Sequence, residues 1–432
     1  MSNPEFGNFA ALLLILFAAA HALGYLFGRL QQPRVIGEIL AGVLLGPFVL
    51  SHFAPNLMNV LPGEAGRQHE VALSVLYNLG LLLLMFASGA ETKGLFCPED
   101  RREVAWLGMV GTAVPFAVAL LVAPNFPLDA LTGRLNQRTP LILVIGIAVA
   151  VTSIPVISKI LHDLGILHTR FARLILGVAV FEDICLWVVL AIATALAKSG
   201  TLPQKQIVWH IAATLLFFGL GLSAFPHLLK RLTGASWNAF SKQNPVAYLF
   251  AILLAYTAAA ALLDVSLVFA AFLAGLAAVA DQEHLADAIH TLSRISFSVF
   301  IPIYFALVGY KLEFGSSFSW SMLVVFLSLA AIVKLCSAAA GARLAGFNWL
   351  ESGNLAIALN ARGGPGIVLA SVAFDAGIIS PSFYTTLVLV AVLTSQAAGA
   401  WLGFIVRRGW PLLVNEPDNR VTQIPAAETK AA

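Results

Sequence analysis

Long apolar runs recur along the whole chain, and only short polar loops separate them. One such run extends from Leu174 to Leu196, and about 20 apolar residues are enough for a helix to cross a bilayer. Only 11% of the 432 residues are charged, against about a quarter in a typical soluble domain. Because a chain in lipid must satisfy its own backbone hydrogen bonds, these runs predict helices. We therefore predict an all-α polytopic membrane protein.

We predict about thirteen transmembrane helices, with boundaries accurate to a few residues. The predicted spans are 8–28, 34–51, 72–91, 104–124, 139–163, 170–197, 207–231, 245–263, 265–281, 294–312, 319–345, 351–377 and 383–407. They form one transmembrane domain within residues 1–412. The polar residues 413–432 are predicted to be a disordered tail.

The loop charges predict the orientation. An odd number of spans places the two termini on opposite sides of the membrane. A cytoplasmic C-terminus puts most loop lysines and arginines inside, among them Arg101, Arg102, Arg407 and Arg408. We therefore predict an outer N-terminus and a cytoplasmic C-terminus, in the inner or plasma membrane of the cell. The net charge of +3 is too small to indicate a nucleic-acid partner, so the lipid bilayer is the expected surrounding.

Two pairs of short segments indicate an internal repeat. Glu38–Leu44 reads E-I-L-A-G-V-L and Ala271–Ala277 reads A-F-L-A-G-L-A. Phe86–Lys93 is similar to Phe305–Lys311. Both pairs are seven predicted spans apart, an odd number, so the copies would have opposite orientation. This is the arrangement of inverted repeats in transporters.

Helix-breaking residues occupy matching places in the two predicted halves. The fifth span contains Val151–Pro155, and the twelfth contains Asn360, Gly363, Gly364 and Pro365. Proline removes a backbone donor and glycine loosens the helix. Simple proline kinks are the alternative, since membrane helices tolerate them. The matched positions predict two discontinuous helices, one in each repeat.

Four ionisable residues are predicted at the same depth in the membrane. Glu182 and Asp183 are adjacent near the middle of the sixth span, Lys334 lies in the eleventh and Arg362 in the twelfth. Such side chains are costly in the hydrocarbon and are usually functional. Adjacent helical residues point about 100° apart. One carboxylate can therefore pair with Lys334 or Arg362 while the other faces a water-filled cavity; the alternative is a fixed network of ion pairs.

The chemistry of this cluster suits a small cation. A carboxylate binds either a hard cation or a proton, so the two can compete for Asp183. The hydroxyls of Thr152 and Ser153 would add neutral oxygen ligands for Na⁺ or K⁺. Glu38, near the cytoplasmic end of the second span, is a candidate for the lining of an inner funnel.

Other functional classes find less support. The chain contains no H-E-x-x-H and no G-x-S-x-G motif, so we predict no catalytic residues, no enzymatic activity and no cofactor. Cys97, Cys185 and Cys336 have neither metal-binding nor disulfide spacing. A sodium-coupled organic-anion symporter of related fold and a cation channel are the alternatives to a cation–proton exchanger.

Five segments resemble one known family. They are Val35–Pro47, Asn78–Glu91, Phe181–Ile184, Pro302–Gly309 and Asn360–Gly363. Together they resemble the monovalent cation:proton antiporter superfamily, which is sodium/hydrogen exchanger-like. The resemblance is greatest to its second branch, with potassium-efflux systems and bacterial sodium/proton antiporters.

The resemblance implies an architecture and an activity. It implies a core domain, about residues 104–231 and 319–407, in which the discontinuous fifth and twelfth spans cross. It also implies a dimerisation or scaffold domain, about residues 8–91 and 245–312, in a homodimer. It also implies secondary antiport of Na⁺ or K⁺ against H⁺ by alternating access.

The resemblance also implies roles for the charged residues. Asp183 would be the carboxylate that alternately binds cation and proton, and Lys334 would pair with Glu182. Arg362 matches an arginine of the crossing helix in other members. Glu182 departs from the pattern, since electrogenic members carry aspartate there. A titratable glutamate leans slightly towards two protons per cation, but one-for-one exchange follows if Arg362 holds it ionised.

Overall fold

The computed structural model describes residues 2–30, 32–47, 49, 66–91, 98–198, 204–315 and 318–414. Within these ranges the protein is nearly all helical, with no strand beyond an isolated bridge between Thr132 and Ile379. The predicted all-α fold class is therefore confirmed. Lys93, Cys97 and the predicted tail from residue 415 onward lie outside the described residues.

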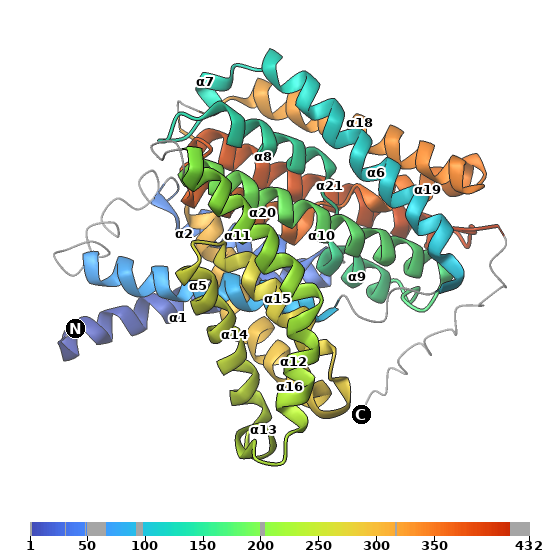
Figure 1. Ribbon diagram of the computed structural model, residues 1–432. Coiled ribbons are helices and arrows are strands. Elements are labelled where there is room, and N and C mark those ends of the chain that lie inside the picture. Colours follow the sequence, from blue (N-terminus) through green and yellow to red (C-terminus); the bar gives the residue numbers. More distant parts are fainter. Residues whose placement is uncertain are drawn as a thin grey trace, which may run out of the picture.

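The helices of Figure 1 cover most of the described chain. They are α1 (Asn3–Arg29), α2 (Arg34–Leu45), α5 (Gly66–Glu91), α6 (Arg101–Val122), α7 (Leu128–Leu131), α8 (Arg138–Ala150), α9 (Ile154–Asp163), α10 (Arg170–Lys198), α11 (Gln204–Leu222), α12 (Ala224–Gly234), α13 (Ala239–Gln243), α14 (Pro245–Leu262), α15 (Leu267–Val279), α16 (Gln282–Ile295), α17 (Ile301–Tyr310), α18 (Trp320–Ala345), α19 (Trp349–Leu359), α20 (Gly363–Asp375) and α21 (Pro381–Arg407).

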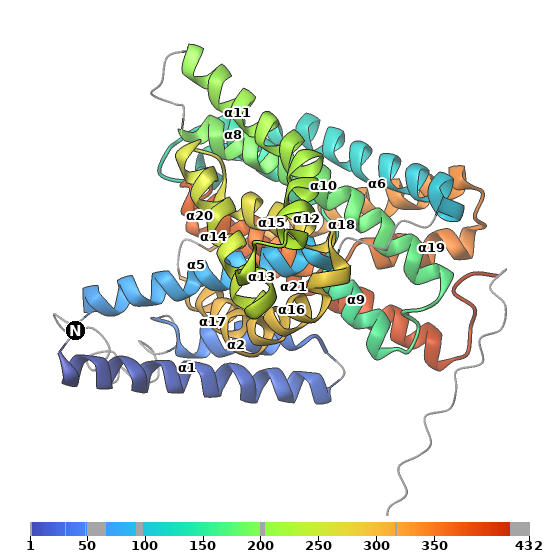
Figure 2. The same ribbon diagram turned by 60° about the horizontal axis from the view of Figure 1, so that its bottom comes forward.

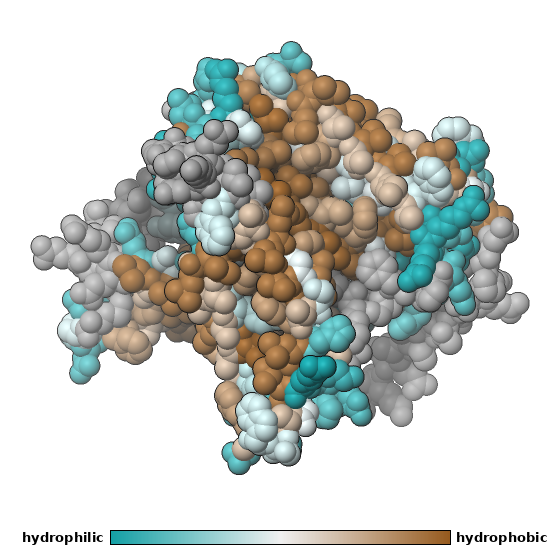
Figure 3. Space-filling model, viewed as in Figure 1, coloured by the Kyte–Doolittle hydropathy of each residue, from teal (hydrophilic) through white to brown (hydrophobic). Residues whose placement is uncertain are grey.

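Length and hydropathy mark many of these helices as membrane spans. Among the described residues, eight helices are long and apolar enough to cross a membrane, or up to ten if each bent helix pair counts as one span. Two further apolar helices, α8 and α15, are shorter. Apolar residues cover the broad middle of the face in Figure 3, and hydrophilic residues gather toward its edges. The count of thirteen spans stays a prediction.

The helices pack into two groups, which Figures 1 and 2 separate. We call α6, α8, α9, α10, α18, α19, α20 and α21 the core group, because they pack on one another around α10 and α20. We call α1, α2, α5, α14, α15, α16 and α17 the scaffold group. Helix α11 contacts α10 in the core group and α15 in the scaffold group. The division into functional domains stays a prediction.

Glycines bring the backbones of α2 and α17 into direct contact. A Cβ atom at Gly42 would lie 1.7 Å from the carbonyl oxygen of Ala306, and one at Gly309 would lie 2.0 Å from that of Ile39. Nothing larger than glycine fits at these two positions without separating the helices. Each carbonyl belongs to the residue three positions before the facing glycine.

Helices α5 and α15 are in contact by the same pattern. A Cβ atom at Gly89 would lie 2.0 Å from the carbonyl oxygen of Phe272, and one at Gly275 would lie 2.0 Å from that of Phe86. Again each carbonyl precedes the facing glycine by three positions. All four glycines fall within the segments that predict the inverted repeat, and this shared pattern supports that prediction.

Both predicted helix interruptions are present. Residues 151–153 separate α8 from α9, and residues 360–362 separate α19 from α20. Pro155 stands in the first turn of α9, and Gly364 and Pro365 stand in the first turn of α20. Proline is well placed there, since the first-turn amides have no intrahelical partner. The axes of α19 and α20 differ by 41°.

The two interruptions are bonded to each other. The backbone N–H of Ser153 donates to the carbonyl of Ala361 at 2.7 Å. The hydroxyl of Thr152 donates to the carbonyl of Leu359 at 2.5 Å. These bonds satisfy backbone groups that the helix ends leave without partners, which is required inside a membrane. The two discontinuous helices therefore meet at their breaks.

Candidate functional site

Glu182 and Asp183 occupy neighbouring positions on α10, and both side chains are fully buried. Glu182 is paired: its Oε1 atom lies 2.6 Å from the Nζ atom of Lys334 on α18. The hydroxyl of Thr112 on α6 donates to the same oxygen at 3.2 Å. The sequence left open whether Lys334 or Arg362 holds a carboxylate, and in the structure it is Lys334.

The ammonium group of Lys334 uses all its donors at this site. Besides Glu182 it donates to the carbonyl oxygens of Gly111 at 3.0 Å and Ala150 at 2.5 Å. An ammonium group has three N–H bonds, so its hydrogen-bonding capacity is filled. A buried ion pair is stable only when such extra bonds compensate for its lost hydration. The ammonium group of Lys334 is thus fully bonded, whereas the Oε2 atom of Glu182 is buried and has no hydrogen-bond partner among the described residues.

Arg362 binds backbone rather than a carboxylate. Its guanidinium donates to the carbonyls of Ala148 at 2.9 Å, Val149 at 3.1 Å and Ala330 at 2.8 Å, and to the Oδ1 atom of Asn360 at 2.8 Å. It forms no ion pair with a described residue. The alternative of one ion-pair network among the four charged residues therefore does not describe this arrangement.

Both cationic side chains converge on the C-terminal end of α8. Lys334 binds the last carbonyl of that helix, and Arg362 binds the two carbonyls before it. The C-terminus of a helix carries a partial negative charge, which nearby cations stabilise. The carbonyls that end α8 are therefore bound by two positive side chains, Lys334 from α18 and Arg362 from the second interruption.

Asp183 differs from its neighbour, because neither of its carboxylate oxygens has a hydrogen-bond partner among the described residues. The charges that act on it are the carboxylates of Glu182 and Glu91. A buried carboxylate without a partner is unstable as a bare anion and requires a bound proton, cation or water. Among the four charged residues of the cluster, Asp183 is therefore the one whose charged group has no hydrogen-bond partner among the described residues.

The two predicted hydroxyl ligands have different surroundings. Thr152 donates its proton to Leu359, which leaves the lone pairs of its oxygen for other use. The Ser153 oxygen accepts from the backbone N–H of Val156 at 3.3 Å and so caps α9. Sequence reasoning did not single out Thr112 or Ser395. The hydroxyl of Ser395 accepts a hydrogen bond from the backbone N–H of Gly363 at 2.9 Å. Lone hydroxyl residues in apolar helices give no distinguishing signal, since most bond their own backbone.

The glycines of the second interruption serve different purposes. Gly363 has φ +33, and a Cβ atom there would lie 2.3 Å from the Cγ2 atom of Val156. Only glycine meets both conditions without strain. At Gly364 an added Cβ atom would meet nothing within 4 Å. Gly363 is thus required where α20 passes α9.

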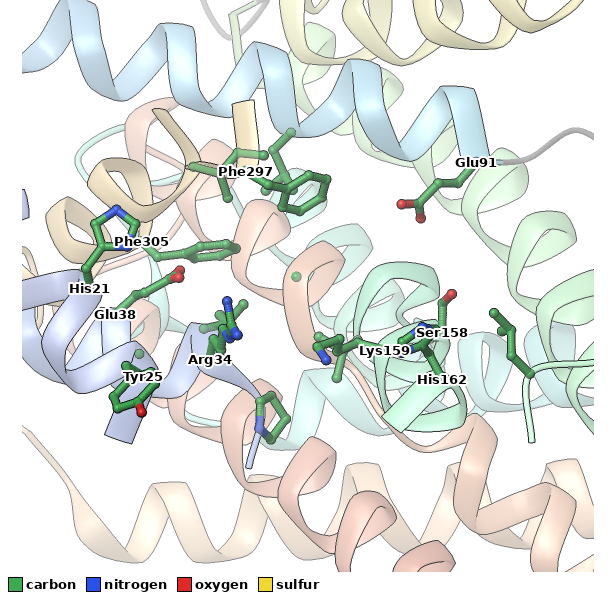
Figure 4. A pocket seen from close by; sticks show the side chains of 18 residues that line it. His21, Tyr25, Arg34, Glu38, Glu91, Ser158, Lys159, His162, Phe297 and Phe305 are labelled. Atoms are coloured by element: carbon green, nitrogen blue, oxygen red, sulfur yellow. The ribbon is translucent and has the colours of Figure 1, made fainter. Parts of the chain in front are cut away.

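A cavity of about 720 Å³ lies between the scaffold group and the core group. Figure 4 shows its lining, with Glu38 from α2 and Glu91 from α5 directed into it and Lys159 on the facing side. Gly364 at the start of α20 also lines it, whereas Asp183 does not. Glu38 thus lines a cavity, and that this cavity opens to the cytoplasmic side stays a prediction.

The opposite ends of α17 and α20 are joined by polar contacts. The Nζ atom of Lys311, just after α17, lies 3.0 Å from the Oδ1 atom of Asp375 at the end of α20. Nearer the start of α17, Tyr304 donates to the hydroxyl of Ser371 on α20 at 3.1 Å. The cavity lies at the start of both helices, because Ile301 and Gly364 line it. The molecule is therefore open at one end of this interface and bonded at the other.

Comparisons with known proteins agree with this architecture. Residues 12–408 match the family model described as "Sodium/hydrogen exchanger, transmembrane". The chain is similar to the K⁺/H⁺ antiporter 1 of Saccharomyces cerevisiae, with 27% identity over 91% of the chain and 46% of that protein. It is also similar to the Na⁺/H⁺ antiporter NhaS4 of Synechocystis, with 26% identity over 89% of the chain and 93% of that protein. The chain thus spans about half the length of the yeast relative.

A solved structure has the same fold. The sodium proton antiporter MjNhaP1 from Methanocaldococcus jannaschii at pH 8 matches with a TM-score of 0.58 and 13% identity, over 94% of this chain and 99% of that one. At this identity the likeness shows the fold alone.

Proposed function

The chain belongs to the transmembrane sodium/hydrogen exchanger family, and on that premise we propose that it exchanges a monovalent cation, Na⁺ or K⁺, for protons across the membrane. The observation that carries the proposal is Asp183, a buried carboxylate without a partner beside a Glu182 that Lys334 already neutralises. One unpaired anionic ligand at the meeting point of two broken helices suits a single charge, whether cation or proton.

Competition for Asp183 couples the two fluxes. A proton and a cation cannot occupy this carboxylate together, so the release of one permits binding of the other. Thr152 offers a neutral oxygen close to the site, since it lies in the interruption that Lys334 and Arg362 border. Alternating access follows when the core group moves against the scaffold group and exposes Asp183 to each side in turn. In this proposal the scaffold group forms the interface of a homodimer.

The Glu182–Lys334 pair determines the charge moved in each cycle. If the pair stays ionised throughout, one proton exchanges for one cation. If Lys334 releases its proton when Asp183 binds the cation, two protons move and the exchange is electrogenic. Flux measured with and without a valinomycin clamp of the membrane potential distinguishes the two cases.

The alternatives fit the site less well. An organic-anion symporter needs a free cationic group for its substrate, but the donors of Arg362 and Lys334 are used by backbone carbonyls, Asn360 and Glu182. A cation channel needs a continuous path, but Asp183 does not line the cavity and polar contacts join the far ends of α17 and α20. The first observation favours a cation as the substrate, and the second favours a carrier over a channel.

Flux in proteoliposomes tests the proposal. The vesicles contain a pH-sensitive dye, and Li⁺, Na⁺, K⁺ or Rb⁺ is added outside. In the wild type, only a cation that the protein transports should drive proton movement. Asp183→Asn removes the charge at nearly constant volume and should abolish this movement. Glu283→Gln, an exposed carboxylate on α16, serves as the control and should retain it. Unchanged flux in Asp183→Asn would contradict the assignment.

A further inference from the structure

Two polar contacts join α17 to α20 beyond the cavity. The hydroxyl of Tyr304 donates to that of Ser371, and the Nζ atom of Lys311 lies 3.0 Å from the Oδ1 atom of Asp375. Ser371 and Asp375 are four residues apart on α20, and Tyr304 and Lys311 are seven apart at the end of α17. At these spacings the two residues of each helix lie on one face. The contacts therefore link the same two helix faces, one after the other.

The Lys311–Asp375 ion pair connects the scaffold group to the core group. The Nζ atom of Lys311 lies 3.7 Å from the ring centroid of Tyr77 on α5, which belongs to the scaffold group. The backbone carbonyl of Asp375 accepts from the guanidinium of Arg134, in the segment before α8 of the core group, at 3.2 Å. Each partner is thus held by its own group. Movement of one group against the other must separate the two charges.

Buried hydroxyl groups lie next to this ion pair. The rings of Tyr77 and Tyr304 are 5.1 Å apart, and both side chains are buried, as is Ser371. The hydroxyl of Tyr77 has no hydrogen-bond partner among the described residues. Buried polar atoms without protein partners are suited to water. If Lys311 and Asp375 separate, these hydroxyls would offer water and an ion a polar route between the helix groups.

From this placement we propose that Lys311 and Asp375 are positioning residues for transport: their ion pair closes the end opposite the cavity and breaks when the core group moves. The proposal rests on the cation–proton exchange proposed above. An interaction present in one of two states shifts the equilibrium towards that state by its own free energy. The apparent affinity for a ligand falls with the populated fraction of the state that binds it. The ion pair therefore sets the ratio of the cation affinities at the two faces.

The ion pair shares this task with uncharged contacts. The hydroxyl of Tyr384 on α21 donates to the carbonyl of Val308 on α17 at 3.1 Å. The backbone N–H of Glu313 donates to the hydroxyl of Thr385, also on α21, at 3.1 Å. These contacts stay when the charges are removed, so loss of the ion pair should shift the equilibrium without abolishing transport.

The test measures the cation dependence of transport separately at each face. Inside-out and right-side-out vesicles from an antiporter-deficient bacterial host present the two faces to added Na⁺ or K⁺. Lys311→Gln and Asp375→Asn should each lower the apparent KM at the face opposite the cavity by about threefold, the size expected for a partly exposed ion pair. The apparent KM at the cavity face should rise, by about threefold at most. The two variants should agree, because each removes the same ion pair.

Two double variants and a control separate gating from a general loss of structure. Lys311→Gln combined with Asp375→Asn should match the single variants, since no ion pair is left to lose. Lys311→Asp combined with Asp375→Lys reverses the charges and should restore most of the wild-type KM ratio. Arg138→Gln is the control, because it removes an exposed 3.0 Å pair with Asp129 that joins α7 to α8 rather than the two groups. Its KM values should stay at wild type.

Opposite shifts of KM at the two faces support the proposal. Unchanged KM values in both single variants would overturn it, as would equal changes at both faces or a lower maximal rate alone. So would a reversed-charge variant that transports with the KM ratio of the single variants. If that variant does not fold, the neutral variants decide the question. Retained flux in Asp183→Asn is a separate result, which would contradict the transport site itself.

Discussion

The two helix interruptions have similar lengths but opposite electrostatic roles. At residues 151–153 the last three carbonyls of α8 accept hydrogen bonds from the cationic side chains of Arg362 and Lys334. At the second interruption, the carbonyl of Leu359 at the end of α19 accepts from the hydroxyl of Thr152, and the carbonyl of Ala361 accepts from the backbone N–H of Ser153. The second interruption contains the positive charge of Arg362, and the carbonyls before the first interruption bind this charge.

This difference bears on how a cation is bound. Broken helices in transporters often direct free carbonyl oxygens at their ions. Here the carbonyls that end α8 are already used by protein cations. The carboxylate oxygens of the cluster without a partner among the described residues are both oxygens of Asp183 and the Oε2 atom of Glu182. The hydroxyl oxygen of Thr152 lies in the adjoining interruption. In the proposed exchange, cation binding would therefore depend on carboxylate oxygens and few neutral oxygens.

The largest expected effect comes from removing the guanidinium group of Arg362, which binds the carbonyls at the end of α8. Arg362→Met leaves the carbonyls of Ala148, Val149 and Ala330 without donors, at a cost of about 1–3 kcal/mol for each buried group. We expect the free energy of unfolding to fall by about 3 kcal/mol or more, with loss of transport. Thermal unfolding of the detergent-solubilised protein measures this. Arg362→Lys, which keeps the charge but not the planar fork, should be intermediate. A fully stable Arg362→Met variant would remove the basis of the comparison.

The ion pair beside the first interruption should give the next largest effect. Lys334→Met leaves Glu182 buried without its cation and should cost about 3–5 kcal/mol of stability. Glu182→Met leaves Lys334 unpaired in the same way. The double variant should be more stable than either single one, because an apolar pair carries no desolvation penalty. Additive losses in this double-mutant cycle would show that the two residues do not act as a unit.

Gly363 and Gly364, which follow the second interruption, differ in backbone conformation and in the space around them. Gly363→Ala combines a positive φ with a clash against Val156 and should destabilise the protein by about 1–3 kcal/mol. Gly364→Ala places its methyl group in open space and should change stability by about 0.5 kcal/mol or less. Unfolding temperatures of the two variants, measured side by side, check this. Equal losses would mean that the break depends on glycine flexibility rather than on this one close contact.

The smallest effects should come from the hydroxyls of the first interruption. Thr152→Val removes the bond to Leu359 and should cost about 1 kcal/mol. It should also raise the KM for the cation, because it removes a neutral oxygen near the site. Ser153→Ala loses only the cap of α9, worth about 1 kcal/mol, and should leave the KM unchanged. Flux titrations of both variants decide whether Thr152 or Ser153 is the ligand.

Sequence alone predicted the features that depend on local residue type. The interruptions follow from Pro155 and from the glycines and proline after Asn360, because these residues break any helix that contains them. The fifth predicted span, 139–163, accordingly matches α8 and α9 at 138–163. Depth along each span brought Glu182, Lys334 and Arg362 to one plane.

The partners within that plane could not be predicted. Arg362 and Lys334 both have long side chains that reach several groups at the same depth. The choice between Glu182 and backbone carbonyls depends on where α8, α10 and α18 lie relative to one another. It also depends on which carbonyls the break leaves without amide donors. Sequence spacing contains neither quantity, and for the same reason the contribution of Thr112 was missed.

The four glycines at which α2 meets α17 and α5 meets α15 have a consequence for sequence variation. Because each glycine faces a carbonyl at the same offset, a side chain at any of the four pushes apart one of two equivalent helix pairs. A saturation mutagenesis screen should therefore find Gly42, Gly89, Gly275 and Gly309 intolerant together, with similar severity. Tolerance at one position of a pair should extend to its counterpart in the other half of the chain. Substitutions at equivalent glycines of the two halves would then be tolerated or rejected together, although the overall sequences of the halves differ.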